Sequence, residues 1–380
     1  MSTTNGFAFG FEAPSDAAIP TAPVVATTRP AVEHAPSEEA AYAAHWPTEH
    51  VRVGEETLAA CAQPADALSL IGGAKSDADV TPGVYEGGFK IWECALDLLE
   101  VMEARRAAGA LTLHGARVLE AGCGAGLPGV LALRRGCALL VLQDFNSEVL
   151  RTTTMATLRR NGGWEAAERG AVRFVSGDWA SVSSKLTDEH IARRREHRRR
   201  ALEGEKTAAA TDVGFDLILT SDTIYSPAAT PALWSLIRAQ LRPNGVALVA
   251  AKSYYFGVGG STADFCALVA SDARFACEAI TVFEDGKSNR REVLEVRRRE
   301  VAAATPPEPA APPEAAAPEP APPEPAPPES VPPEPAAPEA AVPEEAGPEA
   351  EAAAEAEAAA AEAAEDAEEE ASLKRTFAEI

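Results

Sequence analysis

The stretch VLEAGCGAGLPG, residues 118–129, places three glycines at alternate positions directly behind an acidic residue. Gly122, Gly124 and Gly126 permit a left-handed backbone and let a ligand approach the chain closely. The helix that we expect after Gly126 points free N–H groups toward the same place. Together with Glu120 just before them, the glycines predict a turn that holds a small molecule.

Acidic and aromatic residues stand where the later strands are expected to end. Asp144 follows Gly122 by 22 positions and closes the run LLVLQD, where a carboxylate can accept from both hydroxyl groups of a ribose. Asp178 and Trp179, in SGDWA, have the chemistry to accept from an adenine amino group and to cover a purine. A turn-forming role for Asp144 and simple core packing of Trp179 remain alternatives. The group predicts a nucleoside site.

The spacing of the glycines distinguishes two kinds of nucleoside site. Dinucleotide-binding proteins carry G-x-G-x-x-G around a pyrophosphate, whereas this chain has E-x-G-x-G-x-G in EAGCGAG. The second pattern resembles that of S-adenosylmethionine-dependent methyltransferases, whose cofactor brings a methionine sulfonium instead of a phosphate. The sequence therefore favours methyl transfer over hydride transfer.

A parallel sheet is needed to bring these residues together. Apolar, β-branched runs alternate with amphipathic segments, which predicts strands covered by helices on both faces. The expected strands lie at 116–121, 138–144, 171–177, 215–222, 245–253, 275–283 and 291–299, and the expected helices near 88–109, 127–136, 147–161 and 228–242. An Asp-Gly pair between the last two strands predicts a hairpin. The predicted fold class is α/β: a Rossmann-like class I methyltransferase fold with a seven-stranded, mostly parallel sheet and a terminal antiparallel hairpin.

Composition divides the 380 residues into three regions. Residues 1–40 are rich in Ala, Pro and Thr, and we expect them to be disordered. Residues 41–299 form the expected methyltransferase domain, with a lead-in at 41–80 and a basic surface insertion at 183–213. Residues 300–380 form a Pro/Ala/Glu-rich acidic tail, also expected to be disordered, which carries most of the formal net charge of −24.

Cysteine usage and hydropathy bear on the compartment. The six cysteines form no C-x-x-C pair and no histidines stand at ligand spacing beside them, so we expect a reducing compartment and no structural zinc. No apolar run approaches the ~18–20 residues of a membrane span, and the N-terminus lacks the layout of a signal peptide. We expect a soluble monomer without membrane contact in the cytoplasm and the nucleus, with the nucleolus as a further location.

Longer sequence motifs narrow the resemblance to one family. DVTPGVYEGGFKIWECALDLL, VLEAGCGAGLPGVLAL, QDFNSEVL, FVSGDW, FDLILTSDTIYSP and KSYYFGVGGS together resemble the histidine protein methyltransferase family, within the group that carries a D/E-x-x-Y signature. The likeness runs with interruptions over residues 45–299. It implies transfer of one methyl group from S-adenosylmethionine to the τ nitrogen of a histidine in the third large-subunit ribosomal protein. That substrate, free or within a pre-ribosome, would link the enzyme to ribosome assembly and translation.

The resemblance also implies which residues contact the cofactor. Carried over position by position, they are Ile91, Trp92, Glu93, Cys94, Ala95, Gly122, Asp144, Phe145, Asn146, Gly177, Asp178, Trp179 and Ser221. Glu120 and Gly124 join them from the glycine turn. Trp92 is expected to cover the methionine end and exclude water, with core filling as the alternative. Glu93 or Glu120 is expected to hold the amino group or balance the sulfonium.

Methyl transfer to histidine needs orientation more than acid–base help. The lone pair attacks in line with the sulfonium methyl, and holding the two atoms ~3–3.5 Å apart can supply roughly 7–11 kcal/mol. At neutral pH most histidine side chains already carry a free lone pair. The motif SDTIYSP supplies the predicted catalytic residues: Asp222 would accept the N–H of the substrate imidazole, and Tyr225 would wall the pocket. Helix capping by Asp222 is the competing interpretation.

Three further segments each allow two interpretations. The loop YYFGVGG, residues 254–260, is suited to fold over a peptide, or is a structural turn. The run RRREHRRR within the insertion suggests an RNA contact, or is a solvated surface. The acidic tail could attract basic ribosomal proteins, or only keep the chain soluble.

Two other functions stay open from the sequence alone. A lysine methyltransferase of the same D/E-x-x-Y group would share these motifs. A binding protein with a vestigial cofactor site, whose acidic tail chaperones a basic ribosomal protein, is the alternative from another class. The presence of the glycine turn with Asp144, Asp178 and Trp179 argues against a vestigial site.

Overall fold

A central sheet organises the first of two units of the chain, Met1–Val301. The computed structural model describes residues 28–36, 43–63, 66–74, 79–202, 213–286 and 288–299. Most of the predicted disordered start, residues 203–212 of the predicted insertion, and the acidic tail lie outside these residues.

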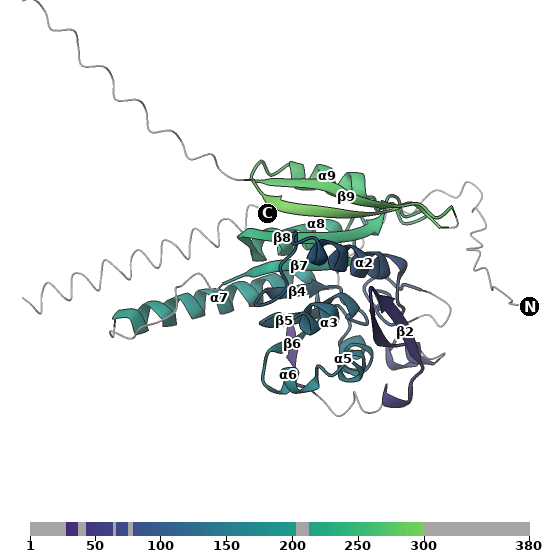
Figure 1. Cartoon of the computed structure of the whole chain (residues 1–380), viewed down its shortest axis with the longest axis horizontal. Helices are drawn as coiled ribbons and strands as arrows, with labels where there is room; N and C mark the ends of the chain where they lie inside the picture. The colour runs from purple at the N-terminus through teal and green to yellow at the C-terminus, as the bar shows by residue number, and fades with distance from the viewer. Residues whose placement is uncertain are drawn as a thin grey trace, which may run out of the picture. The chain divides into compact units, whose positions relative to one another are not determined.

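The sheet has eight strands in the order β1-β6-β5-β4-β7-β8-β10-β9 (Figure 1). Their bounds are β1 Val32–His34, β4 Arg117–Ala121, β5 Leu139–Asp144, β6 Val172–Ser176, β7 Phe215–Ser221, β8 Leu241–Lys252, β9 Phe275–Phe283 and β10 Arg291–Arg298. The strands from β6 to β8 in this order run parallel. β10 pairs antiparallel with both β8 and β9, and β1 pairs antiparallel with β6.

This strand order confirms the predicted α/β fold with a mostly parallel sheet and a terminal hairpin. Every residue of β5 is buried, as expected for a parallel strand covered on both faces. The chain order changes direction between β4 and β7. The carboxyl edge of the sheet at that point is where sheets of this type bind their ligands.

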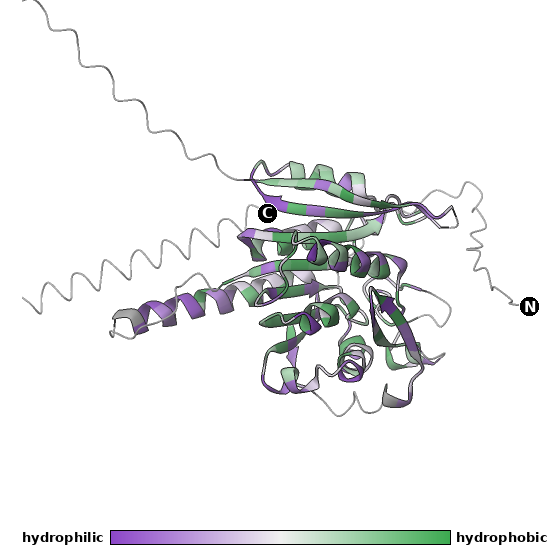
Figure 2. Cartoon of the chain, in the orientation of Figure 1, coloured by the Kyte–Doolittle hydropathy of each residue, from purple (hydrophilic) through white to green (hydrophobic). Residues whose placement is uncertain are grey.

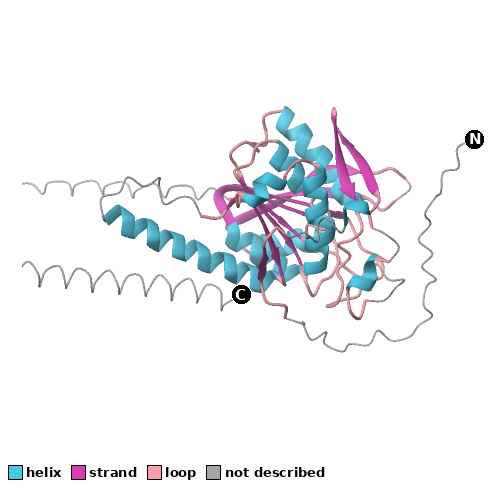
Figure 3. Cartoon of the chain, turned by 90° about the horizontal axis from the view of Figure 1, so that it is seen from below, coloured by secondary structure: helices cyan, strands magenta, loops and turns pink. Residues whose placement is uncertain are grey.

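Helices cover both faces of the sheet (Figure 3). One face carries α2 Glu93–Ala107, α3 Leu127–Arg134 and α5 Met155–Arg160, and the other carries α7 Trp179–Leu202, α8 Thr230–Gln240 and α9 Thr262–Ala270. Shorter helical segments are α4 Ser147–Val149, the π-helical turn η3 Leu150–Thr154 and α6 Trp164–Glu168. A separate apolar cluster lies under each layer, with Leu98 and Leu131 in the first and Leu186 and Leu236 in the second.

The first of these helices is shorter than predicted. The apolar spacing predicted a helix over 88–109, but α2 begins at Glu93. Gly87 before it has a φ of 85°, and its carbonyl accepts from Trp92 Nε1 at 3.0 Å. The residues from Gly87 to Trp92 therefore form a loop instead of the first helical turns.

The lead-in packs against the main domain. It contains η1 Ala43–His45, the hairpin of β2 Thr48–Val53 and β3 Glu56–Cys61, and η2 Ala67–Leu70. The Arg160 guanidinium donates to the backbone carbonyls of Ala43 and Trp46 at 3.0 and 2.9 Å. The rings of Trp46 and Phe89 meet edge to face within a third apolar cluster. These contacts join the lead-in to α5 and to the loop before α2.

The prediction of a disordered start is wrong for residues 28–36. Strand β1 pairs with β6, so the sheet has eight strands instead of the seven predicted. Glu33 binds Arg173 at 2.6 Å, and His34 Nε2 lies 2.7 Å from Ser176 Oγ. These partners lie at least 140 residues further along the chain. A three-residue strand held by such distant partners leaves no pattern in local composition.

Helix α7 contains the first part of the predicted basic insertion. Its start packs on the sheet, and Val182 and Leu186 are fully buried. Its end is hydrophilic (Figure 2), and Arg193–Arg195 and Arg198–Arg200 are exposed. The basic segment therefore prolongs a sheet-covering helix, and residues 183–190 belong to its packed part. Within the described ranges, no helix is long and apolar enough to cross a bilayer.

A buried ion pair joins α2 to β10. The Arg291 guanidinium donates to both carboxylate oxygens of Asp97, at 2.6 and 3.3 Å, and each residue is 8% exposed. Asp97 is therefore the principal anionic partner of a guanidinium that has left the solvent. Removing one partner from such a pair leaves an uncompensated buried charge.

Asp97→Ala should lower the free energy of unfolding by about 3 kcal/mol, because Arg291 stays buried with only the exposed Asp285 carboxylate left as an anionic partner. Glu100→Ala, at an exposed position of the same helix, should change it by less than about 0.5 kcal/mol. Urea unfolding of both variants measures the difference. Equal losses in the two variants would mean that the ion pair does not hold α2 on the sheet.

Candidate functional site

The glycine turn after β4 lies at the point where the strand order reverses. Gly122 and Gly124 have φ values of 63° and 49°, a region that favours glycine. A Cβ on Gly122 would lie 2.6 Å from Thr223 Cγ2, and a Cβ on Gly124 would lie 3.0 Å from the Gly88 carbonyl oxygen. Gly126 ends the turn as the N-cap of α3. Bare backbone is therefore what allows three loops to meet in a narrow cradle here.

Gln143 ties the glycine turn to the segment after β6. Its Oε1 accepts from Gly122 N and from Trp179 Nε1, each at 3.0 Å, and its Nε2 donates to the Gly177 carbonyl at 3.0 Å. The amide is buried, and the Trp179 indole is partly exposed beside the turn. The sequence patterns did not single out Gln143. Its one signal is a polar residue inside an otherwise apolar strand.

Asp144 ends β5 beneath the same turn. Its Oδ2 accepts from Gly124 N at 2.9 Å, and its Oδ1 accepts from Asn146 N at 3.0 Å. Burial raises the pKa of this carboxyl group to about 6, although the two backbone donors oppose the rise. Each oxygen keeps a lone pair for another donor. Two hydroxyl groups placed here would stabilise the ionised form.

The residues after β5 hold two neighbouring segments in place. Asn146 Nδ2 donates to the Val84 carbonyl at 2.8 Å, and its Oδ1 accepts from Glu86 N at 3.2 Å. The Arg29 guanidinium covers the Phe145 ring at 4.3 Å from the ring centroid. One side of the site is therefore built by the segment before α2 and by the segment before β1.

Asp178 works as a helix cap in this structure. Its Oδ1 accepts from Ser181 N in the first turn of α7 at 2.8 Å, and its Oδ2 accepts from Arg29 N at 2.7 Å. A Cβ on Gly177 would lie 2.7 Å from the Pro30 carbonyl oxygen. The chain around Pro30 thus takes the space that Gly177 leaves, and the predicted contact of Asp178 with adenine stays a prediction.

Four other predicted cofactor residues are buried or partly buried where the structure places them. Ile91 packs against the apolar cluster under α2, and Cys94 is fully buried. Ala95 is partly buried in the first turn of α2, and Ser221 is partly buried at the end of β7. All four lie on the segments that form the carboxyl edge of the sheet.

Trp92 lies in a polar setting at the start of α2. Lys90 Nζ is 4.5 Å and Lys252 Nζ 5.8 Å from the centroid of its ring. Glu93 is exposed, with one oxygen 3.6 Å from Lys252 Nζ. The indole is only partly buried, so core filling does not describe it.

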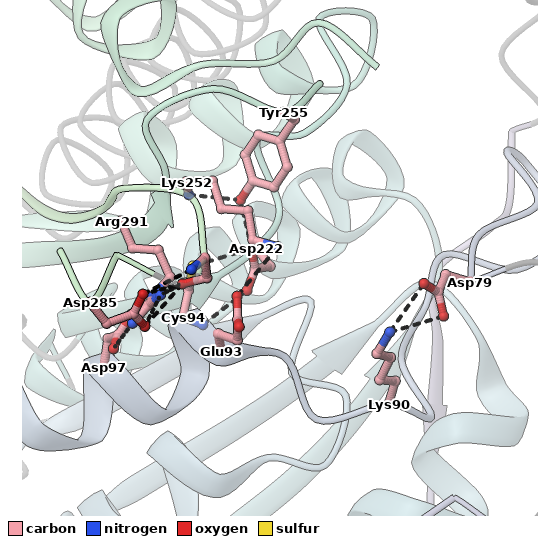
Figure 4. A network of polar contacts seen from close by, with 11 residues as sticks. Asp79, Lys90, Glu93, Cys94, Asp97, Asp222, Lys252, Tyr255, Asp285 and Arg291 are labelled. Atoms are coloured by element: carbon pink, nitrogen blue, oxygen red, sulfur yellow. Dashed lines mark hydrogen bonds and ion pairs between the residues drawn. The ribbon is translucent and has the colours of Figure 1, made fainter. Parts of the chain in front are cut away.

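Asp222 caps α2 from the loop after β7 (Figure 4). Its Oδ2 accepts from Cys94 N at 3.1 Å, and its Oδ1 lies 2.8 Å from the Tyr255 hydroxyl and 3.2 Å from Cys94 Sγ. Burial raises the pKa of the Asp222 carboxyl group, while the bonds from Tyr255 and Cys94 and the charge of Lys252 oppose the rise. Asp222 is 9% exposed, so the competing interpretation of a helix cap is the one this geometry supports.

The backbone of Asp222 is unusual as well. Its φ of 52° is the one positive value of a non-glycine residue in the described part of the chain. Such a conformation costs about 1–3 kcal/mol and is kept only where the surroundings determine it, often at functional sites. With this conformation the Asp222 carboxylate lies at the start of α2.

Tyr225 contacts a carboxylate that the sequence patterns did not single out. Its hydroxyl donates to Glu86 Oε2, and Glu86 Oε1 accepts from Gly83 N at 2.6 Å. Burial and the charge of Glu86 raise the pKa of Tyr225, so the phenol stays protonated. Its ring lies edge to face with that of Tyr255 at 6.3 Å. Tyr225, the predicted pocket wall, therefore holds the carboxylate of Glu86 beside it.

The Glu120 carboxyl group binds the first turn of α3. Its Oε2 accepts from Gly129 N at 2.7 Å, and the residue is 1% exposed. A Cβ on Gly129 would lie 2.6 Å from this oxygen and 2.8 Å from Leu142 Cδ2. Burial raises the pKa of Glu120 to about 8. The geometry does not support the predicted contact of Glu120 with the cofactor's amino group, because the carboxyl group lies under the helix among leucines.

The site that results is a ring of backbone loops held by side chains. Its predicted residues converge on the carboxyl edge of the sheet, and Glu86, Gln143 and Arg29 join them. Over the described residues, no group of three or more His, Cys, Asp and Glu side chains could hold a metal ion. A groove of about 1130 Å³ between β2 and α2 lies apart from this edge and is lined by other residues.

Curated relatives match more than half of this chain. A Dictyostelium discoideum protein named histidine protein methyltransferase 1 homolog is 36% identical over 221 residues, which cover 58% of this chain and 61% of that protein. A Bos taurus protein of the same name is 33% identical over 230 residues, covering 56% of each chain. Histidine protein methyltransferase 1 of Schizosaccharomyces pombe is 34% identical over 221 residues, covering 53% of this chain and 60% of that protein.

These matches confirm the predicted resemblance to histidine protein methyltransferases. The chain spans about three-fifths of the length of the curated relatives it matches. No family model matches the chain.

Solved structures of methyltransferases are similar at a lower level. Magnesium protoporphyrin IX methyltransferase from Synechocystis, with bound SAH, gives a TM-score of 0.36 at 14% identity, covering 53% of this chain and 82% of that chain. The ribosomal protein L11 methylase of Lactobacillus delbrueckii gives a TM-score of 0.30 at 14% identity, covering 54% and 80%. The fold assignment depends on the strand order described above and not on these scores.

The buried acid under α3 predicts a pH dependence of stability. A carboxyl group whose pKa is higher in the folded state favours folding when it is protonated, and this contribution is lost as pH rises from 4.5 to about 8. Glu120→Gln keeps an acceptor for Gly129 N but cannot ionise. The variant should match the wild type near pH 4.5 and be more stable at pH 8, by on the order of 3 kcal/mol.

Thermal unfolding across this pH range measures the effect, and calorimetric uptake of S-adenosylmethionine is the second readout. If Glu120 instead holds the cofactor as an anion, the variant would lose uptake and gain no stability at pH 8.

Proposed function

We propose that this chain is an S-adenosylmethionine-dependent protein methyltransferase that acts on a histidine side chain. The observation that supports the proposal most is the cradle at the point where the strand order reverses. Gly122 and Gly124 have no room for a side chain there, and each carboxylate oxygen of Asp144, beneath the turn, has a lone pair left for another donor. The curated relatives that this chain resembles carry the name histidine protein methyltransferase.

The residues at the edge fit the proposed cofactor. Asp144 is a buried acid whose pKa is raised, so the donors of a ribose diol would relieve the cost of ionising it. The partly exposed indole of Trp179 has its N–H bound to Gln143, which fixes its plane beside the turn. Trp92 and Glu93 at the start of α2 would serve the methionine end. The bare backbone at Gly122 lets the turn lie directly against Thr223, which brings these groups close to one another.

When bound, the cofactor supplies an electrophilic methyl group on a positively charged sulfur. The chain's own task is then to bind and orient the substrate and to keep water out. Tyr225, from the loop after β7, walls the approach with a protonated phenol. Neutral imidazole already carries a lone pair at neutral pH, so no strong base is required of the residues around it.

The finer proposals concern substrate and place in the cell. We propose the τ nitrogen of a histidine in the third large-subunit ribosomal protein as the acceptor, met free or within a pre-ribosome, with action in the cytoplasm and the nucleus. The exposed arginines at the end of α7, Arg193–Arg195 and Arg198–Arg200, would contact RNA of such a particle. Support for the substrate comes from the family resemblance.

Gly122→Ala should reduce uptake of S-adenosylmethionine by at least about 100-fold, which is about 2.7 kcal/mol, because the new methyl group meets Thr223. The matched control is Gly162→Ala. Gly162 also has a positive φ, of 77°, but nothing lies within 4 Å of its Cβ position. Titration calorimetry on both variants separates backbone strain from a blocked cradle. Equal affinities would refute the cradle as the cofactor site.

The acceptor residue is found by mass spectrometry. Wild-type protein, labelled cofactor and ribosomal proteins from cells lacking the enzyme should yield a label on one histidine, at the τ nitrogen. A labelled lysine would support a lysine methyltransferase instead. Cofactor uptake without any transfer, together with binding of a ribosomal protein that is lost when the chain ends at residue 300, would support the chaperone alternative.

A further inference from the structure

Glu86 lies at the carboxyl edge of the sheet on a firmly held loop. Its backbone N–H donates to Asn146 Oδ1 at 3.2 Å. Two residues earlier, the Val84 carbonyl accepts from Asn146 Nδ2 at 2.8 Å and from Arg29 Nη2 at 3.1 Å. Two distant segments, those of Asn146 and Arg29, therefore hold the backbone on which Glu86 stands.

The carboxylate of Glu86 is only partly satisfied. Oε2 accepts from the Tyr225 hydroxyl and Oε1 from Gly83 N, so each oxygen has one donor and room for a second. The residue is partly exposed, and it has no ion-pair partner within the described part of the chain. An acid held in this way is suited to accept from a ligand.

Asp222, the residue predicted for that role, is placed differently. Its two oxygens already receive three donors, from Cys94 N, Cys94 Sγ and Tyr255. It is 9% exposed and lies under the first turn of α2. Asp222 therefore holds the helix, whereas Glu86 is partly exposed and keeps acceptor capacity on both oxygens.

We propose that Glu86 is the catalytic residue that accepts the N–H of the substrate imidazole, with Tyr225 as the positioning residue that holds its carboxylate. The inference rests on the proposed function and names the group that selects which ring nitrogen reacts. One nitrogen is bound to Glu86 through its hydrogen, so the opposite nitrogen, with its lone pair, faces the methyl donor.

The electrons and charges balance in this step. The ring lone pair forms the new nitrogen–carbon bond, and the carbon–sulfur bond breaks with its electron pair remaining on sulfur. The positive charge passes from the sulfonium to the ring, which becomes an N-methylimidazolium whose remaining N–H still points at Glu86. The anion of Glu86 therefore faces the ring where positive charge develops, which stabilises the transition state more than the neutral ring. The imidazolium proton is later released to water.

Tyr225 makes this arrangement specific. Its raised pKa keeps the phenol protonated, so it can only donate to Glu86 Oε2. The Tyr225 ring contacts the Tyr255 ring edge to face. The Tyr255 hydroxyl in turn donates to Asp222 Oδ1 at 2.8 Å. The acid that receives the ring is thereby linked to the helix that covers the site.

Wild type and four variants test the proposal: Glu86→Gln, Glu86→Asp, Tyr225→Phe and the double variant of Glu86→Gln with Tyr225→Phe. The control is Glu49→Gln, the same exchange at an exposed position of β2. Cofactor uptake by calorimetry should be retained in all of them, although Glu86 lies close enough to raise the pKa of Asp144 through its charge. Glu86→Gln should lower kcat for histidine methylation by about 100-fold and should yield a mixture of τ and π products. Glu86→Asp should restore the single product, at a lower rate.

A readout without the cofactor comes from 4-methylimidazole, an analogue of the histidine side chain. Its binding, followed by saturation-transfer NMR, should weaken about tenfold in Glu86→Gln, as loss of a charged acceptor predicts. Tyr225→Phe should show a smaller loss, and the double variant should resemble Glu86→Gln because the two residues act as one unit.

The outcomes separate the two levels of the proposal. A wild-type protein that labels no histidine overturns the proposed function itself. A wild type that labels histidine, while Glu86→Gln keeps its rate, its single product and its affinity for 4-methylimidazole, overturns the role of Glu86 alone. Equal defects in Glu86→Gln and Glu49→Gln would likewise contradict it.

Discussion

Hydrogen bonds from backbone N–H groups to buried and partly buried acids hold the carboxyl edge of this sheet together. Glu120 receives Gly129 N, Asp144 receives Gly124 N, Asp178 receives Ser181 N, and Asp222 receives Cys94 N. The first N–H groups of a helix have no partner within it, and a buried loop must find acceptors elsewhere. The acids supply them from the strand ends, so the loops that form the cradle cannot move independently of the sheet.

This use of the acids explains how far the sequence could predict the structure. The strands and the terminal hairpin follow from local apolar patterns and an Asp-Gly turn, and the glycine turn follows from its spacing. Residue type and position also placed Asp144, Asp178 and Asp222 at the correct edge. What the sequence could not provide was the direction of each carboxylate, because that depends on N–H groups contributed by other segments.

Residues that act across the chain were the ones missed. Arg29 meets Asp178 across 149 residues, and Glu86 meets Tyr225 across 139. Gln143 joins two segments, the glycine turn and the residues after β6, through one buried amide. Glu86 and Gln143 lie inside two of the family-like motifs, but the local spacing gives no role to them or to Arg29. Their roles appear only when the loops are placed in space. The short strand β1 belongs to the same class, since β6 alone makes it a strand.

The pairing of β1 with β6 also determines which part of the site forms last within this half of the chain. Val32 pairs with Ser176, so the first described segment of the chain has no partner until β4, β5 and β6 have been synthesised. Contacts of such long separation form late, because the entropy of closing the intervening chain must be met first. During translation the Arg29 side of the pocket would therefore remain open until β5 and β6 have left the ribosome. A half-made chain has no finished pocket to capture a ligand.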